Sequence, residues 1–367
     1  MRKVFTIALA LLLMTATVAY GQQEGDKPPT DLSKVGTSAA NFLKLPVGAR
    51  GLGLAATGLA TTYDATALYW NPAGIGKIDR MTIAMNRADL YAGISHLFTG
   101  LVIPVGLNTR FGVHYIGLDS GEMESTTVDE PGGTGEYFSV KNLSMGVSVS
   151  QILTDRFTLG FTVKWIQEKI QRSVANSVAI DVGSTFNTGL LGTRLGMAIL
   201  NMGPKMELSG PDLAFYRQLD DDPSEDYAGL NPRAYLDTHE YDLPLMFRMG
   251  VAVDLVGGIS TFMANEMNRV TAHVDIEDPN DQVARLGFSL EYAWNETVYL
   301  RGGYRLRGKI SEQLGARLSG KPRELFEYGF GAGVKTTLAG YALQIDYGLA
   351  SYGDLGNVTQ FFFSMGF

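Results

Sequence analysis

Residues 357–367 read NVTQFFFSMGF, and this last stretch of the chain ends on Phe367. Every second residue counted back from the end is apolar: Phe367, Met365, Phe363 and Phe361. The residues between them are small or polar, with Phe362 as the exception. Because neighbouring side chains of a β-strand point to opposite faces, this alternation predicts a strand with one apolar face.

The same alternation recurs from about residue 80 onward in segments of roughly ten residues, such as FTLGFTVKW (157–165) and RLGFSLEYAW (285–294). The second face of these segments carries glycine and charges of both signs, whereas the first face is continuously apolar. A soluble barrel would point its large residues inward, so this arrangement predicts apolar faces toward lipid and polar faces toward an enclosed lumen. Lipid satisfies no backbone groups, so the strands must close on themselves.

We therefore predict an all-β fold: a transmembrane antiparallel up-and-down β-barrel of about 14 strands, with a short N-terminal helical hatch as plug. The predicted strands are 80–88, 93–104, 109–119, 137–151, 155–167, 177–187, 193–203, 243–254, 268–276, 283–294, 297–307, 325–336, 341–350 and 357–367. The stretch 255–267 is the least regular part of this assignment.

The predicted connections alternate between short and long. The short ones are 106–109, 152–155, 187–192, 294–297 and 338–340, and the long ones are 120–136, 204–242 and 308–324. Outer-membrane barrels have short periplasmic turns and longer extracellular loops. A periplasmic N-terminus in the outer membrane of a Gram-negative-type bacterium is therefore expected, with outer-membrane lipid around the barrel.

The chain begins with a basic start, an apolar run and a small-residue site, the pattern of a secretory signal peptide cleaved after Gly21. The expected division is a signal peptide at 1–21, a linker and hatch at 22–78, and the barrel at 79–367. The absence of cysteine excludes a lipoprotein anchor and a disulfide framework. Without Arg2 and Lys3 the formal net charge moves from −8 to −10, which argues against nucleic-acid binding.

Residues 36–78 lack alternation and are rich in Ala, Gly and Thr. The run SAANFL (38–43), VGAR (47–50) and GLGLAATGLATTYDATALYWNPAGI (51–75) resembles the N-terminal signature of the PorV/PorQ family of outer-membrane proteins. That family is related to the FadL-type fourteen-stranded barrels, which share an Asn-Pro-Ala turn within a hatch that closes the barrel. Here the turn is Asn71, Pro72 and Ala73. The resemblance is specific over 36–78 and looser along the strands to Phe367.

The resemblance implies an accessory or cargo-shuttling role in protein secretion, because some members belong to the type IX secretion system. There the PorV type receives cargo proteins with C-terminal signal domains from the translocon and brings them to surface attachment components. Loops on a rigid scaffold commonly carry such binding. The candidate partner-binding residues all lie in the 204–242 loop: Phe215, Tyr216, Asp220, Asp221, Asp222, Tyr227 and Tyr235.

A second set of residues is predicted to face the lumen on neighbouring strands: Arg248, His273, Asp275, Arg285, Glu291, Arg301, Arg305 and Asp346. Opposite charges among them are expected to pair across the barrel and hold the hatch, since unpaired buried charges are costly. The alternative is that they line a substrate path. The glycines at 329, 331 and 333 alternate on the same face and are expected to make room for the hatch.

The sequence carries no pattern typical of an enzyme, and no cofactor or metal is expected. The four histidines match no metal-ligand spacing, and the acidic run at 220–222 lacks the glycine and positional pattern of a calcium loop, so a solvated loop is predicted. The terminal Phe367 is expected to be a recognition end for the barrel-assembly machinery.

Two other functions stay open. A FadL-like transporter of hydrophobic small molecules needs an apolar pocket, and the charged and small residues predicted for the lumen count against one, with Ile166 and Leu200 as exceptions. A purely structural barrel is the third possibility.

Overall fold

The computed structural model describes residues 36–216, 233–258, 261–282, 284–307 and 328–367. The predicted signal peptide at 1–21, the acidic residues Asp220, Asp221 and Asp222, Tyr227 and the predicted loop 308–324 lie outside these ranges.

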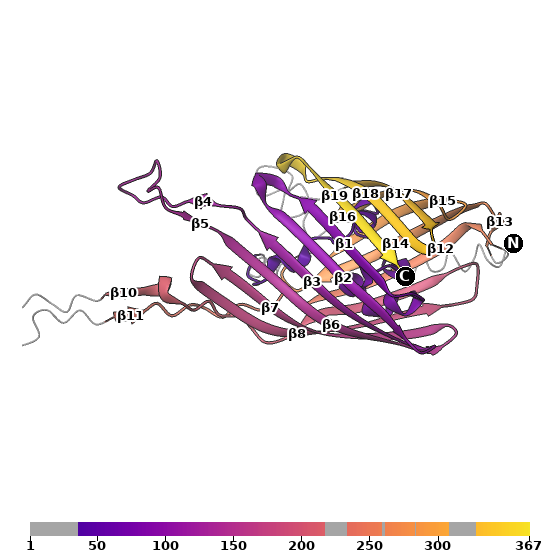
Figure 1. Ribbon diagram of the computed structural model, residues 1–367, viewed down its shortest axis with the longest axis horizontal. Coiled ribbons are helices and arrows are strands. Elements are labelled where there is room, and N and C mark those ends of the chain that lie inside the picture. The colour runs from indigo at the N-terminus through magenta and orange to yellow at the C-terminus, as the bar shows by residue number, and fades with distance from the viewer. Residues whose placement is uncertain (1–35, 217–232, 259–260, 283, 308–327) are drawn as a thin grey trace, which may run out of the picture. The chain divides into compact units, whose positions relative to one another are not determined.

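Fourteen of the described strands form one closed antiparallel sheet (Figure 1). Their bounds are β1 Thr82–Asp89, β2 Ser95–Val105, β3 Thr109–Asp119, β6 Val140–Thr154, β7 Phe157–Ile170, β8 Ser173–Asn187, β9 Arg194–Met202, β12 Met246–Gly257, β14 Asn268–Pro279, β15 Arg285–Trp294, β16 Val298–Arg307, β17 Tyr328–Leu338, β18 Tyr341–Ser351 and β19 Asn357–Gly366. The sheet closes because β1 also pairs with β19. The predicted barrel is confirmed, and each of its fourteen predicted strands overlaps an observed one.

The two faces of each strand separate as the alternation predicts. In β19 the side chains of Phe361 and Phe363 are exposed, whereas Gln360 and Ser364 are buried in the lumen. Phe362, the exception in the sequence pattern, is also buried in the lumen. Large apolar residues are exposed around the outside of every barrel strand. Such a continuous apolar surface is far larger than water tolerates and indicates that this wall faces lipid.

The connections also follow the predicted series. We call the end of the barrel that holds the connections 106–108, 155–156, 188–193, 295–297 and 339–340 the turn end, and the opposite end the loop end. The described loop-end connections include 120–139 and the ends of 203–245. The C-terminus lies at the turn end, where the backbone N–H of Phe367 donates to Met81 O at 2.8 Å.

Short elements lie in the connections. β4 Met123–Glu124 pairs with β5 Tyr137–Phe138, and β10 Ala214–Tyr216 pairs with β11 Arg233–Tyr235. β13 Met263–Ala264 runs parallel to the last residues of β12, in the stretch whose sequence pattern is least regular. Three single-turn helices complete the connections: η5 Tyr91–Gly93, η6 Pro211–Leu213 and η7 Gly353–Leu355.

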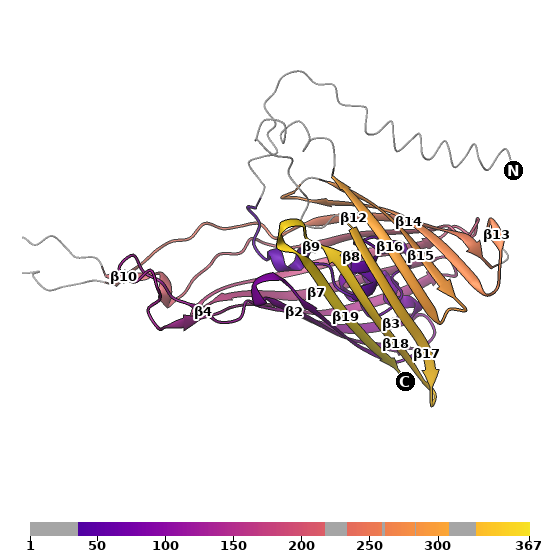
Figure 2. The same cartoon turned by 90° about the horizontal axis from the view of Figure 1, so that it is seen from above.

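Residues 36–78 form the hatch, which lies inside the barrel (Figure 2). Its helices are η2 Asn41–Lys44, α2 Ala49–Gly53, η3 Leu59–Thr61, α3 Ala67–Trp70 and η4 Pro72–Lys77. Within the described ranges, none of the helices has the length and apolar character needed to cross a bilayer. The hatch starts at the loop end, where Lys44 Nζ lies 2.6 Å from Asp281 Oδ2, and leads into β1 at the turn end.

Glycines of the barrel wall make room for the hatch backbone. A Cβ added to Gly160 would lie 2.2 Å from Ala73 N, and one added to Gly329 would lie 2.1 Å from Leu52 O. These distances are far below van der Waals contact, so any side chain there would displace the hatch. The predicted role of the glycines at 329, 331 and 333 therefore holds for Gly329 and for Gly331, where an added Cβ would lie 3.3 Å from Gly53 Cα of the hatch. Gly333 instead accommodates Asp346 Oδ1, at 1.8 Å from an added Cβ.

Candidate functional site

The Asn-Pro-Ala turn joins the hatch to the wall. Asn71 is the N-cap of η4, and its Oδ1 accepts a hydrogen bond from the backbone N–H of Ala73 at 3.1 Å. Its Nδ2 donates to Ser184 O on β8 at 3.0 Å. Asn71 is fully buried, and Gly183 on β8 leaves the space for its side chain. One residue therefore caps a hatch helix and anchors it to a strand.

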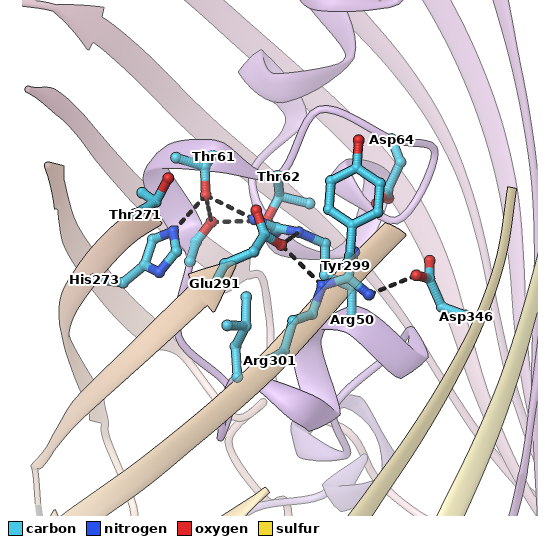
Figure 3. Close-up of polar contacts among 12 residues, drawn as sticks. Arg50, Thr61, Thr62, Asp64, Thr271, His273, Glu291, Tyr299, Arg301 and Asp346 are labelled. Atoms are coloured by element: carbon cyan, nitrogen blue, oxygen red, sulfur yellow. Dashed lines mark hydrogen bonds and ion pairs between the residues drawn. The ribbon is translucent and has the colours of Figure 1, made fainter. Parts of the chain in front are cut away.

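A group of charges that we call the Glu291 cluster also joins the hatch to the wall: Arg50, Arg269, Glu291, Arg301 and Asp346. Figure 3 shows Arg50, Glu291, Arg301 and Asp346 of this cluster. Arg50 of α2 donates from Nε to Glu291 Oε2 at 2.9 Å, and Arg301 of β16 donates to the same oxygen at 2.8 Å. Arg269 donates to Oε1 at 3.3 Å, and Arg301 also pairs with Asp346. The Glu291 carboxylate thus pairs with one arginine of the hatch and with two arginines of the wall.

Arg50 also links two helices of the hatch to each other. Its Nη2 donates to Thr61 Oγ1 at 2.9 Å, which links α2 to η3. Thr61 Oγ1 then lies 3.0 Å from His273 Nε2, and the N–H of Leu59 donates to Asp275 Oδ2 at 2.8 Å. The predicted lumen residues His273 and Asp275 are therefore hydrogen-bonded to the hatch rather than ion-paired.

A second group, the Glu277 cluster, consists of Arg248, Glu277, Arg285 and Arg305. Arg248 donates to Glu277 Oε2 at 2.9 Å and to the Tyr69 hydroxyl of α3 at 3.2 Å. Its guanidinium also lies 4.6 Å from the centre of the Trp70 ring, a cation–π contact. The eight residues of the predicted lumen set are all in the lumen, divided between these two clusters and the hatch contacts.

Sequence reasoning missed Arg50 and Glu277. Glu277 follows His273 and Asp275 at the same parity, but the predicted strand stopped at residue 276. Arg50 lies within the VGAR run of the hatch, where no alternation shows which way a side chain points. A third buried pair, Lys164 with Asp181 at 2.8 Å, joins β7 to β8 within the wall.

The Glu291 and Glu277 clusters occupy one side of the lumen. In the described part of the chain, Arg110 is the only Lys, Arg, Asp or Glu buried on β19, β1, β2, β3 and β6. This side instead carries large apolar side chains that we call the apolar wall: Phe98, Val102, Ile116 and Phe362, with Ile166 on β7. They form one buried cluster with Leu68, Trp70 and Ile75 of the hatch. The expectation that lumen residues are mostly charged and small is wrong for this half.

A polar cavity of about 280 Å³ lies at the turn end. It is lined by Tyr63 and Asp64 of the hatch, by Lys77, Asp79 and Arg80 before β1, and by residues of β17–β19 such as Lys335. The hatch therefore separates this opening from the loop end of the lumen.

Of the predicted partner-binding residues, Phe215 and Tyr216 lie on β10 and Tyr235 lies on β11. Phe215 and Tyr235 are exposed, at 42% and 58%. The hairpin is tied to the barrel by Asp212, whose Oδ2 accepts the backbone N–H of Arg172 at 2.8 Å and whose Oδ1 accepts the guanidinium Nε at 2.7 Å. These hydrogen bonds, the backbone one first, lower the pKa of Asp212 below its ordinary value.

In the portion of the chain that the structure describes, no group of three or more His, Asp or Glu side chains has the arrangement of a metal site. Phe367 is 43% exposed, and its ring meets that of Tyr341 edge-on at 5.6 Å.

The closed barrel of fourteen antiparallel strands with few short N-terminal helices matches the fold of FadL-like barrels. No protein-family model and no curated protein matches the chain. Solved structures do match. A FadL homologue of Pseudomonas aeruginosa is 14% identical, with 88% of this chain and 98% of that chain covered and a TM-score of 0.50.

The Ralstonia pickettii toluene transporter TbuX is 13% identical, with 87% of this chain and 97% of that chain covered and a TM-score of 0.51. The Pseudomonas putida toluene transporter TodX is 12% identical, with 87% and 96% covered and a TM-score of 0.52. At these identities the likeness is one of fold, and two of these neighbours are described as toluene transporters. No family match supports the PorV/PorQ assignment, which stays a prediction.

Proposed function

We propose that this protein transports hydrophobic small molecules across the outer membrane. The observation that carries the proposal is the apolar wall, because a barrel for polar solutes would line its lumen with polar side chains all round. Phe98, Ile116 and Phe362 are each at most 2% exposed and pack inside the barrel rather than toward lipid. The fold is shared with proteins described as toluene transporters, which agrees with this chemistry.

The hatch fills the lumen, so passage requires part of it to move. The ionic clusters lie on one side of the hatch and the apolar wall lies on the other. Apolar contacts are non-directional, and an apolar solute can replace them, whereas a buried ion pair is costly to break. The route for an apolar solute therefore runs along the apolar wall once the hatch undocks, and the ionic contacts of the charged side set how often the hatch undocks.

A disulfide lock tests the proposal. The chain has no cysteine, and the side chains of Thr57 in the hatch and Ser289 on β15 are in hydrogen-bond contact. Thr57→Cys/Ser289→Cys should oxidise readily and fix the hatch to the wall. Uptake of labelled toluene by cells that carry the protein should fall to the vector level when the pair is oxidised and return on reduction. The single cysteine variants are the matched controls. Equal uptake by the oxidised and the reduced double variant would contradict the proposal.

A second candidate function is the accessory, PorV-like role in type IX secretion that the sequence resemblance implies. It is favoured by the exposed aromatic side chains of Phe215 and Tyr235 on the β10–β11 hairpin, which the Asp212 contact tethers to the barrel. Deleting 208–238 should leave an assembled barrel but abolish capture of translocon, cargo or attachment proteins. The disulfide lock should leave such capture unchanged, which separates the two functions.

A further inference from the structure

Buried polar atoms without hydrogen-bond partners gather on the side of the lumen that carries the apolar wall. In the described part of the chain eleven such side-chain atoms occur, and six of them lie on β1, β2, β3 and β6. The six are Asn86 Oδ1, His96 Nδ1, His96 Nε2, His114 Nδ1, Asn142 Oδ1 and Ser144 Oγ. Four of the other five belong to Arg194, Arg248, Asp275 and Asp281, each of which has another atom in an ion pair or hydrogen bond, as Asn86 and Asn142 also have. His96, on the side of the apolar wall, differs from all of these residues because neither of its ring nitrogens has a hydrogen-bond partner.

The sheet register places five of these six atoms in two neighbouring rows, and His114 lies one row further toward the turn end. His96, Leu118 and Asn142 are opposite one another on β2, β3 and β6. Asn86, Phe98, Ile116 and Ser144 form the next row toward the turn end. Adjacent strands are about 4.8 Å apart, so His96 and Asn142 are separated by roughly 10 Å of wall, the span of one small molecule. Each row therefore has apolar side chains between polar ones along the loop-end half of the apolar wall.

The cost of these free atoms is appreciable. A buried polar group without a hydrogen bond is disfavoured, and native proteins rarely keep several together without a ligand, an ion or water. His96 is 1% exposed and Ser144 is fully buried, so bulk water does not reach them. A neutral imidazole carries one donor and one acceptor, which is the complement of a hydroxyl group.

The surroundings define the rest of the ligand. Phe98, Ile116 and Ile166 supply apolar contact for a hydrocarbon body. The described buried residues of β1, β2 and β6 carry no charge. The charges nearby already have partners: Arg110 on β3 donates to Ile78 O at the turn end, Lys164 on β7 pairs with Asp181 at 2.8 Å, and Glu168 on β7 accepts from Asn142 Nδ2 at 3.5 Å. The site thus suits an uncharged molecule.

We propose that the loop-end half of the apolar wall binds an uncharged small molecule that carries a hydroxyl group on an apolar body, with His96 as the hydrogen-bonding partner of the hydroxyl. The inference rests on the proposed transport function and specifies its substrate class. It separates this protein from a carrier of pure hydrocarbons, because a hydrocarbon would leave the His96 nitrogens unsatisfied.

A matched pair of probes tests the assignment. p-Cresol and p-xylene have the same ring and differ in one hydroxyl in place of one methyl. Equilibrium dialysis against the full-length mature protein in lipid nanodiscs, with empty nanodiscs as baseline, gives the affinity ratio of the two probes. In His96→Phe the ratio should shift about tenfold toward p-xylene, the size expected for one lost hydrogen bond to an otherwise unsatisfied group. His96→Gln keeps a donor and an acceptor and should retain the wild-type ratio.

His239→Phe, on an exposed loop residue, is the matched control and should leave the ratio unchanged. The proposal is overturned if His96→Phe keeps the wild-type ratio, or if His96→Gln loses it as fully as His96→Phe does. If His96→Phe fails to assemble, the wild-type protein alone decides, since p-cresol must then bind above the baseline in preference to p-xylene. Equal binding of both probes overturns the hydroxyl assignment but leaves hydrophobic transport standing, whereas binding of neither overturns both.

Discussion

From the Glu291 cluster we predict that a substitution in the wall opens the hatch more than a substitution in the hatch does. When the hatch leaves the wall, Arg50 moves away while Arg269, Arg301 and Asp346 stay on their strands. In Glu291→Gln the docked hatch would bury Arg50 without its carboxylate and beside two arginines. In Arg50→Met the carboxylate keeps both wall arginines. Glu291→Gln should therefore open the hatch much more than Arg50→Met does.

The size of the expected change in hatch opening follows from the burial of the Arg50–Glu291 ion pair. The side chains of Arg50 and Glu291 are 9% and 4% exposed, and their atoms lie 2.9 Å apart. Removing one partner of a buried ion pair costs about 3–5 kcal/mol, because the other charge is left uncompensated. Since about 1.4 kcal/mol corresponds to a factor of ten, the fraction of open hatch should rise by a factor of roughly 10² to 4 × 10³. Arg50→Met also saves the burial of a charge and should cost less than about 2 kcal/mol.

Maleimide labelling of a single cysteine at position 57 measures the opening. Thr57 is 4% exposed, so a cysteine there reacts only when the hatch undocks, and its labelling rate tracks the opening equilibrium. The double variant Glu291→Gln/Arg50→Met should label at nearly the rate of Arg50→Met, because the uncompensated charge of the hatch is gone. Lys164→Met, which breaks a buried ion pair within the wall, is the control and should change the rate little.

The reasoning is refuted if Arg50→Met fails to rescue Glu291→Gln, or if the two single variants label at the same rate. Either result would mean that the cluster stabilises the barrel wall alone and does not hold the hatch.

Three further predictions follow from other contacts. Gly160→Val should undock the hatch, because even the Cβ would lie 2.2 Å from Ala73 N, and labelling at position 57 should then become fast while the heat-modifiable electrophoretic mobility of the barrel persists. Phe367→Lys should lower the amount of assembled barrel in the outer membrane through the assembly machinery, whereas the conservative Phe367→Tyr should not. The Asp212 tether should hold at neutral pH: its pKa is lowered in the fold, so its contribution is complete above the ordinary value of about 4 and is lost as the pH falls through the depressed pKa. Hydrogen exchange at Val174 and Ser209, which bond to each other beside the tether, should report this loss, and Asp212→Ala should abolish the pH step.

Most of the barrel could be predicted from the sequence because the signal is local. The strand predicted at 109–119 is observed as Thr109–Asp119, and the last predicted strand ends one residue beyond the observed Gly366. Strand parity also placed Arg301, Arg305 and Asp346 in the lumen. Errors occurred where the pattern weakens at strand ends: β8 begins at Ser173 rather than at 177, and β14 continues to Pro279, which is why Glu277 was missed.

The partners of the lumen residues could not be predicted. Arg50 and Glu291 are 241 residues apart in the chain, and no periodic pattern links them. The buried side chains of β1, β2 and β3 are uncharged apart from Arg110. The gathering of their side chains against Leu68 and Trp70 depends on the path of the hatch through the lumen.

The sequence by itself thus determined which face of each strand meets lipid and how many strands close the wall, because side-chain direction in a strand depends only on parity. Only the tertiary structure decided that the lumen has a charged side holding the hatch and an apolar side with unsatisfied polar atoms. That division comes from contacts between distant segments, and their energies depend on burial and geometry that no local pattern contains.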